Sequence, residues 1–264
     1  MPDGRTLQVA SVHHYRDQWA KAFDVKYEDD SGEQKYVHQT TYGMSERLLG
    51  ATVATHGDDK GLVMPPSIAP IQVVIIPILS KDGSEEILSL ADKMVKQLKS
   101  DKIRVKLDNR DIRPGQKYYD WEIKGVPLRI ELGPRDIKSN SFMCARRTGE
   151  KSSHKLEDLS DTVTKELDLV NEHMKASAKS HFNSHIKRMP NVKITGSKIS
   201  LEKNLEDGFV YEMAFDGNDA EAEMIEKETG FSFLGESTSS YSEERKCIVT
   251  GKLTHNRIFL AKTY

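Results

Sequence analysis

The sequence predicts a protein of mixed α/β and α+β class, and three observations lead to this prediction. Strand-like and helix-like patterns alternate after residue 71, which is typical of a sheet whose strands are joined by crossover helices. Strand-like segments with one helix precede this stretch, and short strands with acidic turns follow Pro190. We therefore expect three domains, which span residues 1–68, 69–187 and 188–264.

The first expected domain combines strands with one helix. Residues 22–27 and 35–41 are strand-like, and a turn of Asp, Ser and Gly at 29–32 separates them. A helix is expected from about residue 45 to about residue 55, because apolar side chains recur there at helical spacing. Three prolines within residues 65–70 then remove backbone donors and mark the boundary of this domain.

The central domain shows the clearest alternation of elements. The expected elements are strands at 72–77, 104–107 and 128–132, and helices at 84–100 and 114–124. Ser84 can cap the first of these helices, whose apolar residues share one face. We therefore expect a parallel or mixed sheet, followed by a long connecting helix at 156–186.

Composition excludes several classes of protein. The longest apolar stretch, residues 71–79, contains Gln72 and Pro77 and is shorter than the ~20 residues of a membrane helix, so no membrane partner is expected. The first residues lack the basic start and apolar stretch of a secretory signal. Only two cysteines, Cys144 and Cys247, are present, which favours a reducing compartment. We expect a cytoplasmic protein.

Charge is distributed unevenly along the chain. Residues 69–154 contain 17 Lys and Arg against 12 Asp and Glu, whereas the flanking stretches are acidic. A basic module within a neutral chain is the pattern expected where a polyanion such as RNA binds. Solvated basic faces are also common, so charge alone leaves both interpretations open.

Residues 43–70 carry the first informative motif. Gly43 precedes Arg47, which falls in the first turn of the expected apolar helix, and the run GLVMPPSIAP follows from Gly61. Taken alone, Arg47 could simply pair with a neighbouring carboxylate on the surface. The order resembles the third signature motif of class II aminoacyl-tRNA synthetases, specifically of the prolyl-tRNA synthetase family. The resemblance implies that residues 1–68 are a remnant of the class II antiparallel-sheet catalytic domain, and that Arg47 contacts ATP.

Two upstream segments strengthen this resemblance. Residues 7–13 (LQVASVH) and 39–43 (QTTYG) resemble the family's Leu-Gln-x-Gly-Thr-x-His and Thr-Ser-Trp-Gly segments, although Ala10, Ser11 and Tyr42 depart from the commoner residues. The implied roles are ATP binding by Gln8, Ser11 and Arg47, a proline pocket of His13, Thr41 and Tyr42, and catalysis by Arg47, Gln8 and His13.

Residues 108–136 are dense in groups that recognise single-stranded RNA. Arginines can donate to guanine edges or phosphates, carboxylates can accept from guanine, and an aromatic ring such as Trp121 can stack on a base. The same residue types would also serve an interdomain charge network. The whole run resembles the anticodon-binding domain of class II synthetases in its prolyl form. The resemblance implies that Glu122, Arg129, Arg135 and Asp136 read the two guanines of the proline anticodon.

The third domain resembles the C-terminal domain of archaeal and eukaryotic-type prolyl enzymes, which commonly binds zinc through four cysteines. Only Cys247 remains, and Asp216, Ala220 and Val249 stand where the others would be. Zinc needs three or four suitable ligands in a tetrahedral arrangement, so we expect no zinc and no other bound metal.

The resemblance implies a ligase that joins proline to proline tRNA through a prolyl-adenylate, with ATP and Mg²⁺ as substrate and a homodimer as the full-length assembly. The matching region begins partway through the family's catalytic domain, without motifs 1 and 2, so this chain alone is expected to be inactive. Two alternatives remain open: a stand-alone factor that binds the tRNA anticodon, and one half of a split synthetase that needs an N-terminal partner chain.

Overall fold

The computed structural model describes residues 1–79, 84–195, 198–239 and 241–264. The chain forms two compact units. One unit contains residues 1–52 and 185–264, and the other contains residues 53–184. The three-domain division expected from the sequence remains a prediction.

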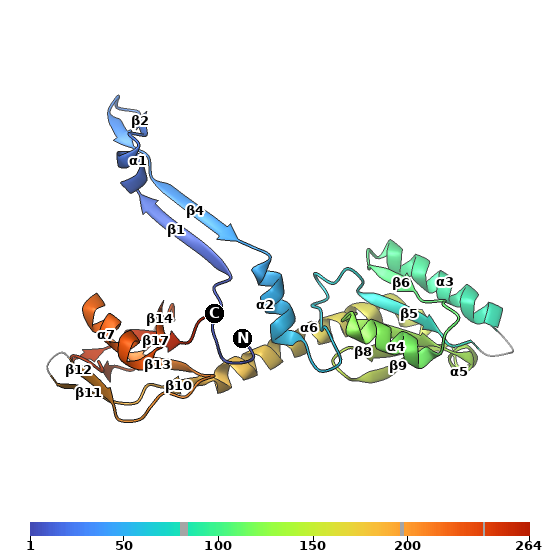
Figure 1. Cartoon of the computed structure of the whole chain (residues 1–264). Coiled ribbons are helices and arrows are strands. Elements are labelled where there is room, and N and C mark those ends of the chain that lie inside the picture. Colours follow the sequence, from blue (N-terminus) through green and yellow to red (C-terminus); the bar gives the residue numbers. More distant parts are fainter. Residues whose placement is uncertain (80–83, 196–197, 240) are drawn as a thin grey trace. The chain divides into compact units, whose positions relative to one another are not determined.

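The unit of residues 53–184 is built on a five-stranded mixed sheet (Figure 1). In spatial order the strands are β6 (Val105–Leu107), β5 (Val73–Pro77), β7 (Leu128–Leu132), β8 (Ser141–Arg146) and β9 (Lys151–Lys155). Strand β5 pairs in parallel with β6 and β7, whereas β8 pairs antiparallel with β7 and β9. The expectation of a mixed sheet is confirmed, and β8 and β9 are two strands that the sequence analysis missed.

The helices of this unit follow the expected pattern. They are α3 (Ser84–Ser100), α4 (Pro114–Ile123), the short α5 (Pro134–Lys138) and the long α6 (Leu159–Ser184), which a 3₁₀ turn, η1 (Leu156–Asp158), precedes. Helix α4 begins with Pro114, whose fixed φ and missing N–H suit the first helical position. The two main helices of the central domain are therefore where the sequence predicts them, and the long helix begins three residues later.

Both faces of the sheet are buried at β5, which explains its unbroken apolar sequence. Val73 and Ile75 join a core cluster with residues of α3 and α6. Val74 and Ile76 point to the other face and pack with Trp121 of α4. Side chains of β7 that alternate in the same way are therefore directed either to the α3 and α6 face or to the α4 face.

The other unit contains a four-stranded sheet and one helix near its C-terminal end. The strand order is β10 (Ile186–Arg188), β13 (Val210–Ala214), β17 (Arg257–Ala261) and β14 (Ser232–Glu236). Two small ribbons accompany it, β11 (Val192–Thr195) with β12 (Lys198–Leu201) and β15 (Arg245–Lys246) with β16 (Leu253–Thr254). Helix α7 (Asp219–Thr229) begins with a reciprocal cap, in which Asn218 and Glu221 each accept a backbone N–H of the other.

The N-terminal segment of this unit is an exposed two-stranded ribbon of β1 (Ala10–Arg16) and β4 (Gln39–Met44). The segment between them holds helix α1 (Gln18–Ala22) and a hairpin of β2 (Lys26–Glu28) with β3 (Gln34–Tyr36), and helix α2 (Arg47–His56) follows the ribbon. The strand predicted at 22–27 is wrong for residues 22–25, because Ala22 is the last residue of α1, in which Ala20 is buried, and β2 begins only at Lys26. The assignment of this ribbon to a class II catalytic sheet remains a prediction.

Within the described parts of the chain, no helix combines the length and apolar character that crossing a membrane requires.

Candidate functional site

The strand alternation places Arg129 on the α4 face of the sheet. Leu128, Ile130 and Leu132 of β7 belong to the core cluster on the α3 and α6 side. Because successive side chains of a strand point to opposite faces, Arg129 and Glu131 lie on the side that α4 covers. A basic and an acidic side chain are thus held next to each other on one face.

Arg129 is held in place by two contacts. Its Nε donates to Oε1 of Glu131 at 3.0 Å, and its guanidinium carbon lies 4.1 Å from the ring centroid of Tyr118. Only 13% of the side chain is exposed. Its two terminal nitrogens have no partner among the residues that the structure describes. A planar group fixed on one side therefore presents two parallel donors, which match a guanine edge or a phosphate.

Glu131 organises the surroundings of Arg129. Lys151 Nζ donates to the same Oε1 at 2.9 Å. Burial alone would raise the pKa of Glu131, but Lys151 and Arg129 hold this pKa below its ordinary value. Burial and the charge of Glu131 raise the pKa of Tyr118 to about 12. At neutral pH the Arg129 cluster, meaning Tyr118, Arg129, Glu131 and Lys151, therefore carries two positive charges and one negative charge.

The other expected anticodon residues lie on neighbouring elements. Glu122 is one helical turn after Tyr118 on α4 and is partly buried. Asp136 accepts a hydrogen bond from the Gly133 N–H at 2.8 Å, and this bond caps α5. The negative charge of Asp136 also contributes to the raised pKa of Tyr118. Arg135 is exposed on α5. The structure thus brings Arg129 and Asp136 close to Tyr118 and places Glu122 on the same face of α4. Among the described residues, no contact links Arg135 to this group.

Trp121 does not have the role that the sequence suggested. Its side chain is packed with Val74 and Ile76, only 6% of the residue is exposed, and its indole N–H donates to Asp108 at 2.7 Å. A ring covered in this way offers no free face to a base, so the suggestion that Trp121 stacks on RNA is corrected. The exposed aromatic residue of α4 is instead Tyr119, with 60% exposure.

Sequence reasoning missed Tyr118, Glu131 and Lys151. The alternating pattern of residues 128–132 (LRIEL) was a usable signal, because it puts both charges of β7 on one face. Lys151 left no such signal, since it reaches Glu131 only through the pairing of β7, β8 and β9.

The three residues expected to bind ATP lie together in the other unit. Gln8 Nε2 donates to Ser11 Oγ at 2.7 Å, and Arg47 Nη1 donates to the Gln8 carbonyl oxygen at 3.1 Å. All three line a cavity of about 340 Å³ at the end of the β1–β4 ribbon. Its amide, hydroxyl and guanidinium groups are suited to a polar, anionic ligand.

The three residues expected to form the proline pocket divide between two faces of the ribbon. His13 pairs with Thr41 across the strands, so their side chains share one face. Tyr42 pairs with Val12 instead, which places it on the opposite face, and 77% of it is exposed. The register thus brings His13 and Thr41 together but not Tyr42.

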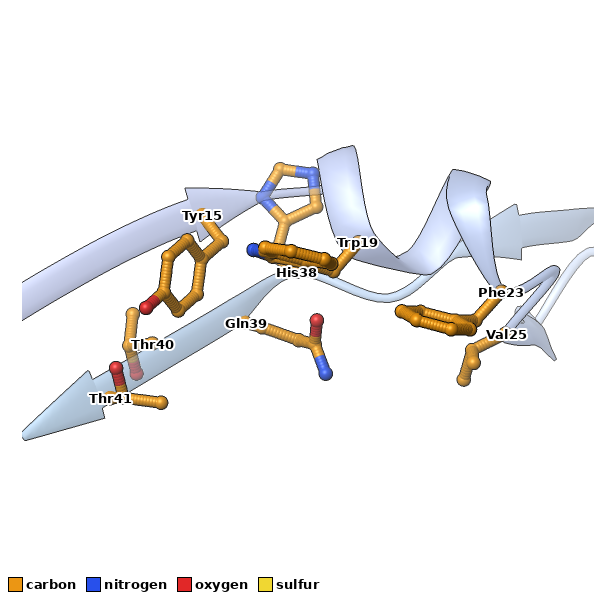
Figure 2. Close-up of a pocket in the computed structure, with 8 residues that line it drawn as sticks. All are labelled: Tyr15, Trp19, Phe23, Val25, His38, Gln39, Thr40 and Thr41. Carbon is orange, nitrogen blue, oxygen red and sulfur yellow. The ribbon is translucent and has the colours of Figure 1, made fainter.

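An aromatic pocket of about 600 Å³ lies beside Thr41 (Figure 2). Tyr15 from β1 and Trp19 from α1 meet edge to face with ring centroids 6.0 Å apart, and Phe23 stacks on Trp19 at the same separation. His13 stacks on Tyr15 at 5.4 Å, outside the lining of this pocket. Aromatic walls with a few polar groups suit a small, largely apolar ligand.

The residues near Cys247 do not fit a zinc site. Its sulfur accepts the backbone N–H groups of Asp216 at 3.2 Å and Thr250 at 3.4 Å. Across the described ranges, no group of three or more His, Cys, Asp or Glu is arranged to hold a metal. One thiolate does not supply the ligand set that zinc needs.

We expect purified protein to contain zinc well below one atom per chain, because the ligand set is reduced to Cys247. The measurement is elemental analysis of the protein after dialysis against a chelator. Stoichiometric zinc that survives chelation would show that histidine or carboxylate ligands have replaced the cysteines.

Comparison with known proteins adds two findings. Residues 72–166 match the family model described as the anticodon binding domain. The chain is 43% identical over its whole length to a proline–tRNA ligase of Thermococcus kodakarensis, of which it covers 55%. Proline–tRNA ligases of Methanocorpusculum labreanum (43% identity, 96% of this chain, 52% of that protein) and Pyrococcus abyssi (42%, 100%, 55%) are similar too. The chain spans about half the length of the curated relatives it matches.

Proposed function

The chain is a homologue of proline–tRNA ligases over its whole length, and on this premise we propose that its residues 53–184 bind proline tRNA and read the anticodon. The free donor pair of Arg129 is the observation that carries this proposal. The full enzyme would attach proline to that tRNA through a prolyl-adenylate, with ATP and Mg²⁺ as substrate, in the cytoplasm and as a homodimer.

The chemistry of guanine explains the choice of residues. Guanine presents acceptors at O6 and N7 and donors at N1 and N2, so its recognition needs both cations and carboxylates. Arg129 and Arg135 would donate to the acceptors, while Glu122 and Asp136 would accept from the donors. The capping bond of Asp136 occupies one carboxylate oxygen and leaves the other available.

The unit of residues 1–52 and 185–264 would act at the end of the tRNA to which proline is attached. Gln8, Ser11 and Arg47 would contact the nucleotide, because they line one polar cavity. His13 and Thr41 share a face of the ribbon and would contact proline, and Tyr42 would contribute only if its strand paired differently in the full enzyme. Two alternatives, a stand-alone anticodon-binding factor and a split enzyme with an N-terminal partner chain, would use the same tRNA-binding unit, meaning residues 53–184.

Replacing Arg129 tests the proposal. Arg129→Ala should weaken binding of proline tRNA by about 1–3 kcal/mol and reduce the preference over a tRNA whose anticodon guanines are changed, because one bidentate base contact is lost. Binding of wild type and variant to both tRNAs is measured at one fixed salt concentration, since electrostatic affinity depends on salt.

Two further variants separate base reading from charge. Arg129→Lys keeps the positive charge but loses the planar fork, so it should also lose preference. Lys155→Ala removes an exposed charge from β9 and should affect both tRNAs alike. In the described part of the chain, the ion pair of Lys155 is with Glu157, and it makes none with the Arg129 cluster. A wild-type protein that does not distinguish the two tRNAs, or an Arg129→Lys variant with unchanged preference, contradicts anticodon reading by Arg129.

A further inference from the structure

The unit of residues 53–184, in which we place tRNA binding, also contains a cavity of about 310 Å³ that is separate from the Arg129 cluster. This cavity lies between the end of α2 and the loop after it, the turn between β8 and β9, and the middle of α6. Its polar lining consists of Thr55, His56, Asp58, Lys60, Arg147, Thr148, His173 and Ser177. Its floor is apolar, formed by Val63 and Met174.

Arg147 forms a rigid wall of this cavity. Its side chain is only 2% exposed, and it donates to both carboxylate oxygens of Asp58, at 2.8 and 2.5 Å. It also donates to the carbonyl oxygens of Gly61 at 3.3 Å and Glu122 at 3.2 Å. Asp58 is 47% exposed, and its negative charge is balanced by the buried Arg147. Arg147 also joins this cavity to the end of α4 that carries Glu122.

The remaining polar groups of the cavity are available to a ligand. The ammonium group of Lys60 and the imidazoles of His56 and His173 make no hydrogen bond or ion pair within 4 Å in the part of the chain that the structure describes. Lys60 lies near enough to Asp58 for its charge to help lower the pKa of that carboxyl, but Arg147 is the hydrogen-bonded partner of Asp58. Burial lowers the pKa of His56, so its ring is neutral at pH 7 and can donate from one nitrogen. With Asp58 and Arg147 cancelling each other, the lining carries a net positive charge from Lys60.

We propose that this cavity binds a phosphate group of the RNA backbone. A phosphate is an anion with several acceptor oxygens, and the cavity offers one cation whose ammonium donors make no hydrogen bond, together with imidazole and hydroxyl donors. The choice of RNA as the source of the phosphate rests on the proposed function. A phosphate held beside the end of α4 would position the strand next to Glu122 without reading its sequence.

Lys60→Met tests this proposal, with Lys175→Met as its matched control. Both lysines are exposed, but Lys175 pairs with Glu172 on α6 and does not line the cavity. Affinities for proline tRNA and for the anticodon-changed tRNA are measured across a series of salt concentrations. Lys60→Met should lower both affinities by the same factor, roughly 3- to 10-fold at low salt, and reduce the salt slope by about one unit. His173→Gln should lower both affinities as well, and Lys175→Met should leave both unchanged.

A Lys60→Met variant that behaves like Lys175→Met overturns the proposal, as does a loss confined to one of the two tRNAs. Failure of wild type to distinguish the tRNAs overturns anticodon reading but leaves this comparison valid. Titration with inorganic phosphate, followed by the ring resonances of His56 and His173, separates the two sources of phosphate. Histidine shifts that saturate with free phosphate, without any effect of Lys60→Met on tRNA binding, would exclude RNA as the source.

Discussion

Arg257→Ala is expected to destabilise the unit of residues 1–52 and 185–264 by about 3–5 kcal/mol, the range for breaking a buried ion pair, because it removes the buried guanidinium that lies 3.7 Å from Glu212. The Arg257 side chain is fully buried on β17. It donates to the carbonyl oxygens of Thr254 and Asn256, both at 3.1 Å, and of Glu243 at 2.6 Å. Alanine leaves these acceptors without their donor and opens a cavity as well.

The measurement is amide hydrogen exchange of β13 and β17, because the two units of this chain need not unfold in one step. Arg257→Met is the matched variant, since it fills most of the volume and isolates the lost hydrogen bonds. Protection of β5 in the other unit is the internal reference. Unchanged protection of β13 in both variants would show that Arg257 is not what holds this sheet together.

Asp108→Ala is expected to destabilise the unit of residues 53–184 by roughly 3 kcal/mol. The Asp108 side chain is 1% exposed, and it accepts from Arg110 at 2.7 and 2.8 Å and from the Trp121 indole at 2.7 Å. We place the loss at the lower end of the range for a broken buried pair, because Arg110 is 46% exposed and can return to water. Trp121 is buried and cannot reach water, so its indole N–H is left without a hydrogen-bond partner in the variant.

The same carboxylate should make stability depend on pH. Burial would raise the pKa of Asp108, but donation by Arg110 and Trp121 outweighs it and holds the pKa below its ordinary value. The stabilisation is therefore present above the unfolded pKa of about 3.9 and is lost as pH falls through the lower folded value.

Acid denaturation followed by exchange in α4 measures this effect, with Asp108→Asn as the control that keeps an acceptor but no titrating charge. The acid sensitivity of α4 should be smaller in Asp108→Asn than in wild type. Equal acid sensitivity in the two proteins would assign the effect to other carboxylates.

Several elements could be predicted because their signal is local. Helix α3 matches its expected range, and β5 and β7 match to within one residue, since apolar periodicity is a property of residues a few positions apart. The strand predicted at 22–27 was partly wrong because it too relied on a local signal. Its apolar residues serve a short helix and then a strand, and a single window cannot separate the two.

The candidate site was predicted only in part. Arg129 could be named from a resemblance, but Tyr118 lies 11 residues before it on another element and Lys151 lies 22 residues after it. Trp121 and Tyr119 are close in sequence, yet one is buried and the other exposed, because α4 turns only one face to the sheet.

The sequence by itself determined β5, β6, β7, α3, α4 and α6 of the central domain, its basic charge, and the similarity to proline–tRNA ligases. The tertiary structure decided which groups surround Arg129, on which face of the ribbon Tyr42 lies, and that Arg147 neutralises Asp58 in a cavity also lined by Lys60. Periodicity and motifs are properties of neighbouring residues, whereas these contacts depend on strand register and helix packing, which bring together residues up to 89 positions apart.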